Sequence, residues 1–513
     1  MRLAQTASAI IVGVDAHIIE VEAHLADGLV GTAITGLADT SINEARDRVR
    51  AAVSSTGFTW PQQRITIGLS PAWLPKRGSA LDLAIALGVL AAAGHVAPER
   101  LHRTLVVGEL GLDGTVRAVR GVLPIALAAR RWGFTTIVVP MSNAAEAALV
   151  PELEVVPVAS LGHALRRLGV ACDIGTDVAT EQAELDAEPE HKDFIDVRGQ
   201  REPKHALEVA AAGGHHIALL GPPGVGKTLL AERLPSILPP LEHEDALEVT
   251  AVKSVLSDRP VRLQTVPPFA APHHGASMTS LIGGGAVGTP KVGLITAAHR
   301  GVLFLDEAPE FAINVLESLR QPLESGNIAI ARAGFAIVLP ARFQLVIAAN
   351  PCPCGLAFDA EARCSCEPSQ RRRYLGRISG PLMDRIDVRV VVETPSSGEV
   401  ALGAEDTGET SAVIAERVRE ARQRQRVRLV GTPWRTNAEV PGPVIRKRWR
   451  LPLATQELFN AELDRNRGAS VRGMDRTLRM AWTIADCEGH AAPTTNDLVL
   501  AMRLRDAGGR WTA

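Results

Sequence analysis

The stretch IALLGPPGVGKTLL, residues 217–230, restricts the fold of this chain more than any other part of its sequence. Four apolar residues typical of a buried strand lead into a loop rich in glycine and proline, and a second apolar run follows Thr228. The loop fits the pattern G-x-x-x-x-G-K-[ST], with the strand before it and the helix after it that a phosphate-binding loop requires. We therefore expect an α/β domain that presents this loop at the end of a strand.

The phosphate-binding loop predicts both a nucleotide and the metal ion that accompanies it. Glycines let successive backbone N–H groups turn inward around phosphate oxygens, and the amino terminus of the following helix favours negative charge. Lys227 is placed to reach the β- and γ-phosphates, and the Thr228 hydroxyl is a ligand for Mg²⁺. The sequence thus predicts ATP and Mg²⁺ as cofactors, bound by Gly221, Pro222, Pro223, Gly224, Val225, Gly226, Lys227 and Thr228.

A second motif, GVLFLDEAPE at residues 301–310, supplies side chains that hydrolysis needs. Its apolar run leads to Asp306, which we expect to hold Mg²⁺, and to Glu307, which we expect to polarise the attacking water. Either carboxylate alone could instead cap a helix over APEFAINVLESLRQPLE, residues 308–324. Because the motif occurs together with a phosphate-binding loop, ATP hydrolysis is the favoured interpretation.

Asn350 ends a third buried run, FQLVIAANP at residues 343–351. An amide at the end of such a strand can orient water against the γ-phosphate, and this is the role we predict. Taken alone, an asparagine before Pro351 would be an ordinary turn residue.

Composition indicates a soluble globular protein. The chain is 46% hydrophobic and 22% charged, with a formal net charge of −2. Its 513 residues suggest about two to four domains. The longest apolar run, which begins at Leu83, has about a dozen residues and is too short to span a bilayer. We expect a cytoplasmic protein with no membrane partner, and the six cysteines fit a reducing compartment better than a disulfide framework.

Four segments follow one another along the chain. Residues 1–170 alternate strand-like runs, such as AIIVGVDA, with alanine-rich helical stretches, and residues 171–193 form an acidic linker. Residues 194–396 form a second α/β block, whose continuous apolar runs are typical of a parallel sheet covered on both faces. Residues 397–513 are helical in pattern.

Six motifs spread over the chain belong together, namely GPPGVGKT, APHHGASMTSLIGGG, AHRGVLFLDEAPEF, LRQPLESGNIAIARAG, IAANPCPCG and GRISGPLMDRID. With them, nearly the whole chain resembles the magnesium-chelatase-like AAA+ ATPases of the YifB/ComM type. The resemblance implies a Lon-protease-like amino-terminal α/β domain, an AAA+ P-loop α/β core and a carboxyl-terminal helical lid. It also implies a homo-hexameric ATPase that acts as a DNA helicase and promotes branch migration in homologous recombination and natural transformation.

The same resemblance assigns roles to two arginines. Arg385 in LMDRID matches the arginine finger that reaches the nucleotide of the neighbouring subunit, and Arg472 in SVRGMDR matches the second sensor in the lid. Arg476 is an alternative second sensor, and each arginine could instead form a surface ion pair of little energetic weight. The roles of His273 and His274 stay open, because the residue before APHH differs from the family pattern.

Two other activities remain alternatives to a DNA helicase. A chelatase-like AAA+ motor would remodel a protein partner without DNA, although chelatase motor subunits lack the Lon-like block. An ATP-dependent protease needs a Ser-Lys dyad, yet Ala80 and an apolar residue near Leu123 stand where the resemblance puts the serine and the lysine. Ser79 with Lys76 is displaced by one residue from that arrangement, so we consider proteolysis the least favoured activity.

Four cysteines are crowded into one short segment with the spacing C-x-C-x9-C-x-C, namely Cys352, Cys354, Cys364 and Cys366. Thiolates this close can form a tetrahedral site for a structural Zn²⁺ ion. We expect zinc here ahead of the alternative, free thiols on a loop.

Two residues are expected to contact DNA, either single-stranded or branched. Arg332 lies at the glycine turn of the hairpin-like IAIARAGFAIV, and Lys291 lies in the glycine-rich GGGAVGTPKVG. In related hexameric helicases two such hairpins face the central channel. The net charge does not indicate a nucleic-acid partner, and arginine runs are usually solvated helix faces. The prediction of DNA contact therefore depends on local basic patches and on the family resemblance.

Overall fold

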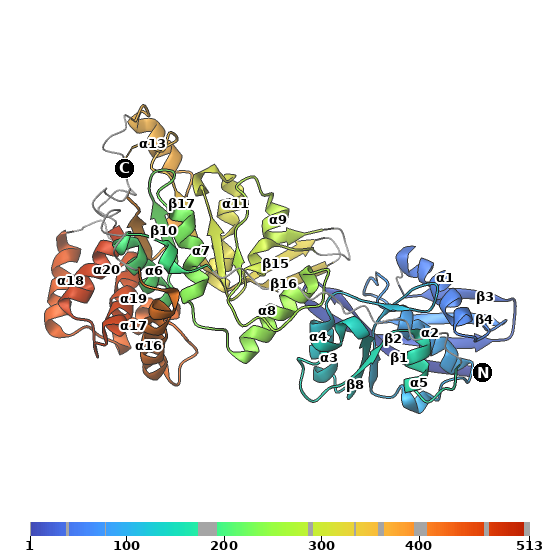
Figure 1. Ribbon diagram of the computed structural model, residues 1–513. Coiled ribbons are helices and arrows are strands. Elements are labelled where there is room, and N and C mark those ends of the chain that lie inside the picture. The colour runs from blue at the N-terminus through green and yellow to red at the C-terminus, as the bar shows by residue number, and fades with distance from the viewer. Residues whose placement is uncertain are drawn as a thin grey trace.

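The computed structural model describes residues 2–36, 40–76, 78–172, 192–285, 291–332, 335–357, 364–393, 408–465 and 471–506. An amino-terminal α/β block, a second α/β block and a group of helices follow one another along the chain (Figure 1). The acidic linker predicted at 171–193 and the boundary predicted at 396 lie almost wholly outside the described residues, so both stay predictions.

The amino-terminal block is built on a seven-stranded mixed sheet in the order β3-β4-β2-β1-β5-β8-β9. Helix α2 (Asp82–Ala92) is buried along its whole length, because its sequence is apolar on nearly every side. The sheet strands are β1 (Arg2–Val12), β2 (Asp15–Ala26), β3 (Gly31–Thr35), β4 (Arg64–Ser70), β5 (Thr104–Val106), β8 (Thr136–Pro140) and β9 (Glu154–Val158). The other elements are α1 (Thr40–Ser55), η1 (Pro98–Arg100), β6 (Glu109–Leu110), β7 (Val116–Arg117), α3 (Val122–Arg131), η2 (Met141–Asn143), α4 (Ala144–Ala147) and α5 (Leu161–Arg167).

The run AIIVGVDA, expected as one strand, belongs to two strands joined by a tight turn. β1 ends at Val12 and β2 begins at Asp15, and these two residues pair across the antiparallel hairpin. Gly13 has a φ of 69°, a left-handed conformation that glycine adopts at little cost. The expectation of a single strand is therefore wrong, because this glycine reverses the chain.

The second block contains a five-stranded parallel sheet in the order β11-β14-β17-β10-β18. Its strands are β10 (Ile217–Leu220), β11 (Phe269–Ala270), β14 (Val302–Leu305), β17 (Gln344–Ala349) and β18 (Val388–Val391). Successive residues of β10 pack into different apolar clusters on the two faces, with Ile217 and Leu219 on one and Ala218 and Leu220 on the other. The expected parallel sheet covered on both faces is confirmed.

Helices and short hairpins surround this sheet. They include η3 (Phe194–Asp196), α6 (Arg201–Gly213), α7 (Lys227–Ile237), α8 (His243–Leu256), α9 (Met278–Ile282), α10 (Leu294–Ala297), α13 (Pro368–Leu375) and α14 (Gly380–Met383). Two antiparallel pairs are inserted, β12 (Gly283–Gly284) with β13 (Lys291–Val292), and β15 (Asn327–Arg332) with β16 (Phe335–Pro340).

The single helix expected over residues 308–324 is broken into three pieces. They are η4 (Ala308–Glu310), α11 (Ile313–Ser318) and α12 (Arg320–Ser325). Pro322 has no N–H to donate to the carbonyl of Ser318, which interrupts the helical hydrogen bonding between α11 and α12. The prediction of a continuous helix is wrong, since this proline interrupts the helix between α11 and α12 and the extended backbone at Phe311 and Ala312 separates η4 from α11.

The carboxyl-terminal helices pack beside the second block, at the end far from the amino-terminal block (Figure 1). They are α16 (Ser411–Leu429), η5 (Asn437–Glu439), α17 (Gly442–Arg448), α18 (Leu453–Arg465), α19 (Val471–Glu488) and α20 (Thr495–Asp506). Side chains from α16, α19 and α20 share one apolar cluster with α6 and β10. Within the described part of the chain, no helix is both long and apolar enough to cross a membrane.

Helix α8 connects the two α/β blocks through a buried polar contact. Ser254 near the end of α8 hydrogen-bonds to the carboxylate of Glu146, and its carbonyl accepts from the N–H of Gly121 at 3.1 Å. Glu146 also accepts from the N–H of Leu123 at 2.9 Å. Burial raises the pKa of Glu146, and the surrounding donors only partly offset this effect. The amino-terminal block is thereby fixed to the second block.

Candidate active site

The phosphate-binding loop closes around its own lysine. α7 begins at Lys227, and Gly226 before it has a φ of 93°. The Nζ of Lys227 donates to the carbonyls of Gly221 and Pro222, both at 2.7 Å, and to Oδ1 of Asn350 at 3.0 Å. Only 7% of Lys227 is exposed, and burial lowers its pKa. The loop therefore already aims the ammonium group inward, where phosphate oxygens can replace the two carbonyls.

The predicted magnesium ligands are also in contact. The Thr228 hydroxyl donates to Oδ2 of Asp306 at 2.6 Å, and Asp306 directly follows β14. A hydroxyl and a carboxylate are oxygen donors of the kind that Mg²⁺ prefers, so these residues fit the ion. The parallel strands β10, β14 and β17 end at the same edge of the sheet. This shared edge explains how Asp306, which is 78 positions after Thr228, and Asn350, which is 123 positions after Lys227, both reach the loop.

Glu307 lies at this edge with its side chain half-exposed. Its φ of 49° is unusual for a residue with a side chain, and such conformations concentrate at functional sites. Nδ1 of His274 lies 3.6 Å from Oε2 of Glu307, and the ring centroids of His273 and His274 lie 4.1 Å apart with their planes tilted by 35°. The sequence left the role of these histidines open, and the structure places His274 beside the predicted base.

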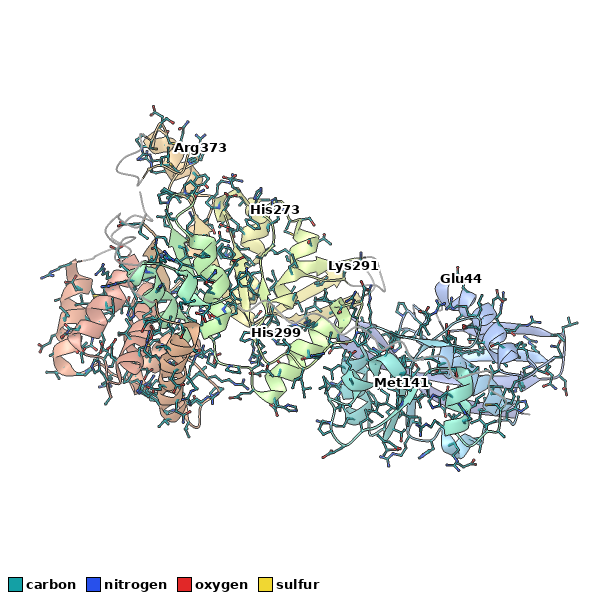
Figure 2. The ribbon with its side chains drawn as sticks, in the orientation of Figure 1. Glu44, Met141, His273, Lys291, His299 and Arg373 are labelled. Carbon is teal, nitrogen blue, oxygen red and sulfur yellow. The ribbon has the colours of Figure 1, made fainter. Side chains whose placement is uncertain are left out.

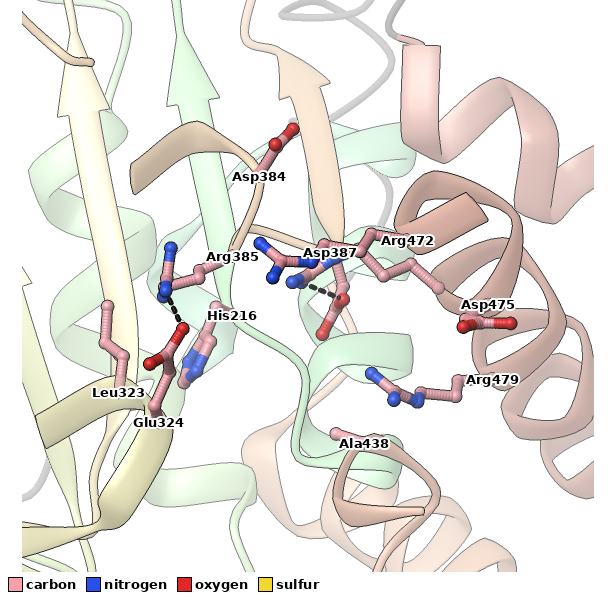
Figure 3. A pocket seen from close by; sticks show the side chains of 11 residues that line it. His216, Leu323, Glu324, Asp384, Arg385, Asp387, Ala438, Arg472, Asp475 and Arg479 are labelled. Atoms are coloured by element: carbon pink, nitrogen blue, oxygen red, sulfur yellow. Dashed lines mark hydrogen bonds and ion pairs between the residues drawn. The ribbon is translucent and has the colours of Figure 1, made fainter. Parts of the chain in front are cut away.

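The two predicted arginines lie together in a different place, a pocket of about 290 Å³ (Figure 3). Arg385 forms an ion pair with Glu324, and its Nε is buried with no hydrogen-bond partner among the described residues. Burial and, after it, the neighbouring arginine charges lower the pKa of Arg385. The pocket is lined by His216, Leu323, Glu324, Asp384, Arg385, Asp387, Ala438, Arg472, Asp475, Arg476 and Arg479.

Arg472 and Arg476 differ in how tightly they are held. Arg476 donates to Asp387 at 2.8 Å and only 14% of its side chain is exposed. Burial alone would raise the pKa of Asp387, but the hydrogen bond from His215 and the charge of Arg476 hold it far below its usual range. Arg472 is exposed and has no ion pair with the described residues. Arg472 is thus the less tightly held of these two arginines.

This arginine pocket lies at the opposite edge of the sheet from the phosphate-binding loop. His216, which lines the pocket, precedes β10, whereas Gly221 follows it, and Asp387 similarly precedes β18. Four residues of strand separate the two edges by about 13 Å. The pocket arginines therefore lie about one strand length from the edge that holds Lys227.

The predicted DNA contacts lie on the two inserted hairpins. β15 and β16 pair from Asn327↔Pro340 to Arg332↔Phe335, so Arg332 is the last paired residue before the turn, as expected. Its side chain lies outside the described part of the structure. Lys291 begins β13 and is exposed (Figure 2). Ile328 and Ile330 anchor the longer hairpin in the core.

The residues of a displaced Ser-Lys dyad have other partners. Lys76 is buried and its Nζ donates to the carbonyl of Pro71, while the Ser79 hydroxyl bonds to Glu109. Leu123, near the position of the lysine in the Lon-like pattern, is fully buried. Among the described residues, no lysine hydrogen-bonds to the Ser79 hydroxyl.

The four cysteines come together in space. Their sulfur atoms all lie within 4.8 Å of one another, directly after β17 and close to the phosphate-binding loop. Residues 358–363, between the two pairs, lie outside the described chain.

Comparison with known proteins matches most of the chain. Residues 193–400 match the family model described as magnesium chelatase, subunit ChlI; residues 21–143 match subunit ChlI of Mg-chelatase; residues 408–505 match the ChlI carboxyl-terminal model. An uncharacterized protein of Mycobacterium tuberculosis is 46% identical over 99% of this chain and 100% of its own length. Competence protein ComM of Haemophilus influenzae is 40% identical over 95% of this chain and 94% of its own length. YifB of Escherichia coli is 39% identical over 96% of this chain and 94% of its own length.

Proposed function

Since this chain belongs to the YifB/ComM family of magnesium-chelatase-like AAA+ proteins, we propose that it is an ATP-hydrolysing motor that moves along DNA as a ring of six copies. The observation that carries the proposal is that the expected catalytic residues lie at two opposite edges of one sheet. Lys227, Thr228 and Asp306 meet at one edge of the sheet, and the arginine pocket lies at the other edge. A ring of identical subunits brings these two edges of neighbouring chains together.

The residues at the phosphate edge perform distinct tasks in the proposed hydrolysis. Lys227 exchanges its two loop carbonyls for phosphate oxygens, and Asn350, which already contacts Lys227, orients water. Thr228 and Asp306 would hold Mg²⁺, which neutralises phosphate charge when it is bound. Glu307 accepts a proton from the attacking water, and its exposed position leaves it accessible to that water. A structural Zn²⁺ ion at the cysteines would take no part in these steps.

The residues at the opposite edge complete the site of the next subunit. The unpartnered Nε of Arg385 and the repulsion among neighbouring arginines both favour an incoming anion. Arg385 would leave Glu324 for the γ-phosphate of the adjacent chain, and exposed Arg472 would contact the same nucleotide. Hydrolysis then requires an assembled ring.

DNA is the proposed substrate of the motor because two inserted hairpins carry basic residues away from the sheet. Lys291 and Arg332 lie on these hairpins, and six copies of each in a ring would surround a strand with positive charge. We further propose that the motor promotes branch migration during homologous recombination, including natural transformation. The relative from Haemophilus influenzae carries the name of a competence protein.

The test is ATP turnover measured with no DNA, with single-stranded DNA, with duplex DNA and with forked DNA. We expect DNA to stimulate turnover, with a stimulation that falls as salt concentration rises. Lys227→Ala is the control that should show no turnover with any addition. Turnover that no DNA stimulates, but that a protein from the same cell does, would contradict the proposal and favour a chelatase-like motor that remodels a protein partner.

A further inference from the structure

Four cysteine sulfur atoms meet at one point beside the phosphate-binding loop. The Sγ atoms of Cys352 and Cys354 lie 3.3 Å apart, and Sγ of Cys364 lies 3.6 Å from the first and 3.5 Å from the second. Cys366 completes the group within 4.8 Å. Two separate sequence pairs thus converge, and the segment 358–363 between them lies outside the described residues.

The sulfur separations fit a shared metal ion and not a disulfide. A disulfide bond brings its sulfur atoms to about 2.05 Å, and all the measured separations are much longer. Zinc–sulfur bonds of about 2.3 Å in a tetrahedron place the sulfur atoms about 3.8 Å apart, close to what is observed. Four soft thiolates select Zn²⁺ over the hard ions Mg²⁺ and Ca²⁺.

The cysteine cluster also contacts the nucleotide site. Cys352 is buried and follows Asn350, the partner of Lys227, by two residues. Gly355 closes the next turn with a φ of 81° and packs so tightly on the phosphate-binding loop that a Cβ there would lie 2.5 Å from Cδ of Pro223. The turn formed by residues 352–355 therefore supports the outer side of the loop.

The other end of the cluster holds helix α13. The carbonyl of Cys366 accepts from Nε of Arg371 at 3.2 Å, and Glu367 and Gln370 form a capping box at the start of the helix. Tyr374 and Leu375 anchor the far end in the apolar core. α13 extends beyond the sheet and carries Arg373 outward (Figure 2). One cluster thus joins the nucleotide site to a projecting basic helix.

We propose that Cys352, Cys354, Cys364 and Cys366 bind one Zn²⁺ ion, and that this ion holds the 352–355 turn against Pro223 of the phosphate-binding loop. All four ligands come from the chain, so the ion has no open position for a substrate and its role is structural. Removing the ion frees the turn, and the loop then loses its outer support. The effect on nucleotide binding rests on the proposed function, whereas the metal content does not.

The first experiment measures metal content by elemental analysis on the full chain, purified without chelators. We expect about one zinc per chain, as a structural tetrathiolate site binds tightly. Cys364→Ser should lose most of it, while the matched control Cys172→Ser, which packs in the amino-terminal core, should keep it. Co²⁺ in place of zinc should give the visible absorption of a tetrahedral thiolate site. A metal-free parent that also fails to take up zinc or cobalt would overturn the site, and iron in its place would overturn the ion's identity.

The second experiment uses the unmodified chain, because a cysteine variant can fail to fold for other reasons. Zinc is withdrawn with a strong chelator, and the affinity for a fluorescent ATP analogue is measured before withdrawal, after it and after zinc is added back. We expect a severalfold weaker affinity that recovers with zinc. An unchanged affinity in the zinc-free chain would contradict the proposal that the ion supports the loop at Pro223, but it would not contradict the proposal that the four cysteines bind zinc. A parent chain that contains zinc but binds no nucleotide would instead contradict the proposed function.

Discussion

The separation of Lys227 from Arg385 predicts that two inactive variants restore each other. Lys227→Ala removes the phosphate contact, and Arg385→Ala removes the proposed contact to the neighbour. Four residues of β10 put about 13 Å between the two edges of the sheet, so we expect Arg385 to serve the nucleotide of a neighbouring chain and not the one bound by its own Lys227. Each variant alone should therefore be inactive, whereas mixed rings should contain some complete sites.

The expected recovery follows from counting neighbours in a closed ring. A complete site needs an intact Lys227 in one subunit and an intact Arg385 in the next, and in an equal mixture each condition holds for half of the positions. About one quarter of the sites are then complete, and turnover should reach about one quarter of the parental rate if sites act independently. A site built within one chain predicts no recovery at all.

A second mixture provides the matched control. The double variant Lys227→Ala/Arg385→Ala mixed equally with the parent leaves about one quarter of shared sites complete, but about one half of sites confined to single chains. The assay is steady-state ATP turnover, with native mass spectrometry to show that mixed rings form. No recovery in the first mixture and half the parental rate in the second would refute the shared site.

Four further changes test other parts of the structure. Glu307→Gln should retain ATP binding and ring assembly but stop turnover, because the amide cannot take a proton; turnover at the parental rate would remove Glu307 as the base. Arg332→Ala should leave turnover without DNA intact and abolish its stimulation by DNA, with a weaker effect for Lys291→Ala; an unchanged salt dependence of DNA binding would exclude these contacts. Arg48→Ala should destabilise the fold by about 1–2 kcal/mol at pH 7, as measured by urea unfolding, because the fully buried Asp82 loses its charged partner and takes up a proton instead. Burial raises the pKa of Asp82 to about 6 in the folded chain, so that loss should shrink as pH falls from 7 towards 4, and a loss independent of pH would contradict the assignment.

The phosphate edge of the site could be predicted from the sequence because its residues obey local rules. Gly226 and Lys227 belong to one short pattern, and Asp306 and Asn350 each end an apolar strand. Parallel strands end at one edge, so these positions had to converge once the sheet was recognised. The contacts of Lys227 with Asn350 and of Thr228 with Asp306 show that these residues meet at this edge.

The arginine pocket could not be located in the same way. Resemblance singled out Arg385 and Arg472, but only the packing of α19 against the start of β18 shows that they share a pocket far from Lys227. Arg385 also pairs with Glu324, which is 61 positions away in the chain. Such pairings depend on long-range packing, which no local pattern encodes.

Turns and breaks were also misjudged where one residue overrides an apolar pattern. Gly13 converts an apparent strand into a hairpin, and Pro322 divides an apparent helix. The close approach of Gly355 to Pro223 is a further feature that spacing alone does not reveal.

Movement of DNA is the central claim, and the most direct measurement is ATP-driven branch migration on a forked DNA with homologous arms and one labelled strand. We expect the labelled strand to be released only when ATP is hydrolysed, and we expect Glu307→Gln and Arg385→Ala to prevent its release while still binding ATP. Release of the strand without hydrolysis, or no release by a ring that hydrolyses ATP on the same DNA, would contradict the account.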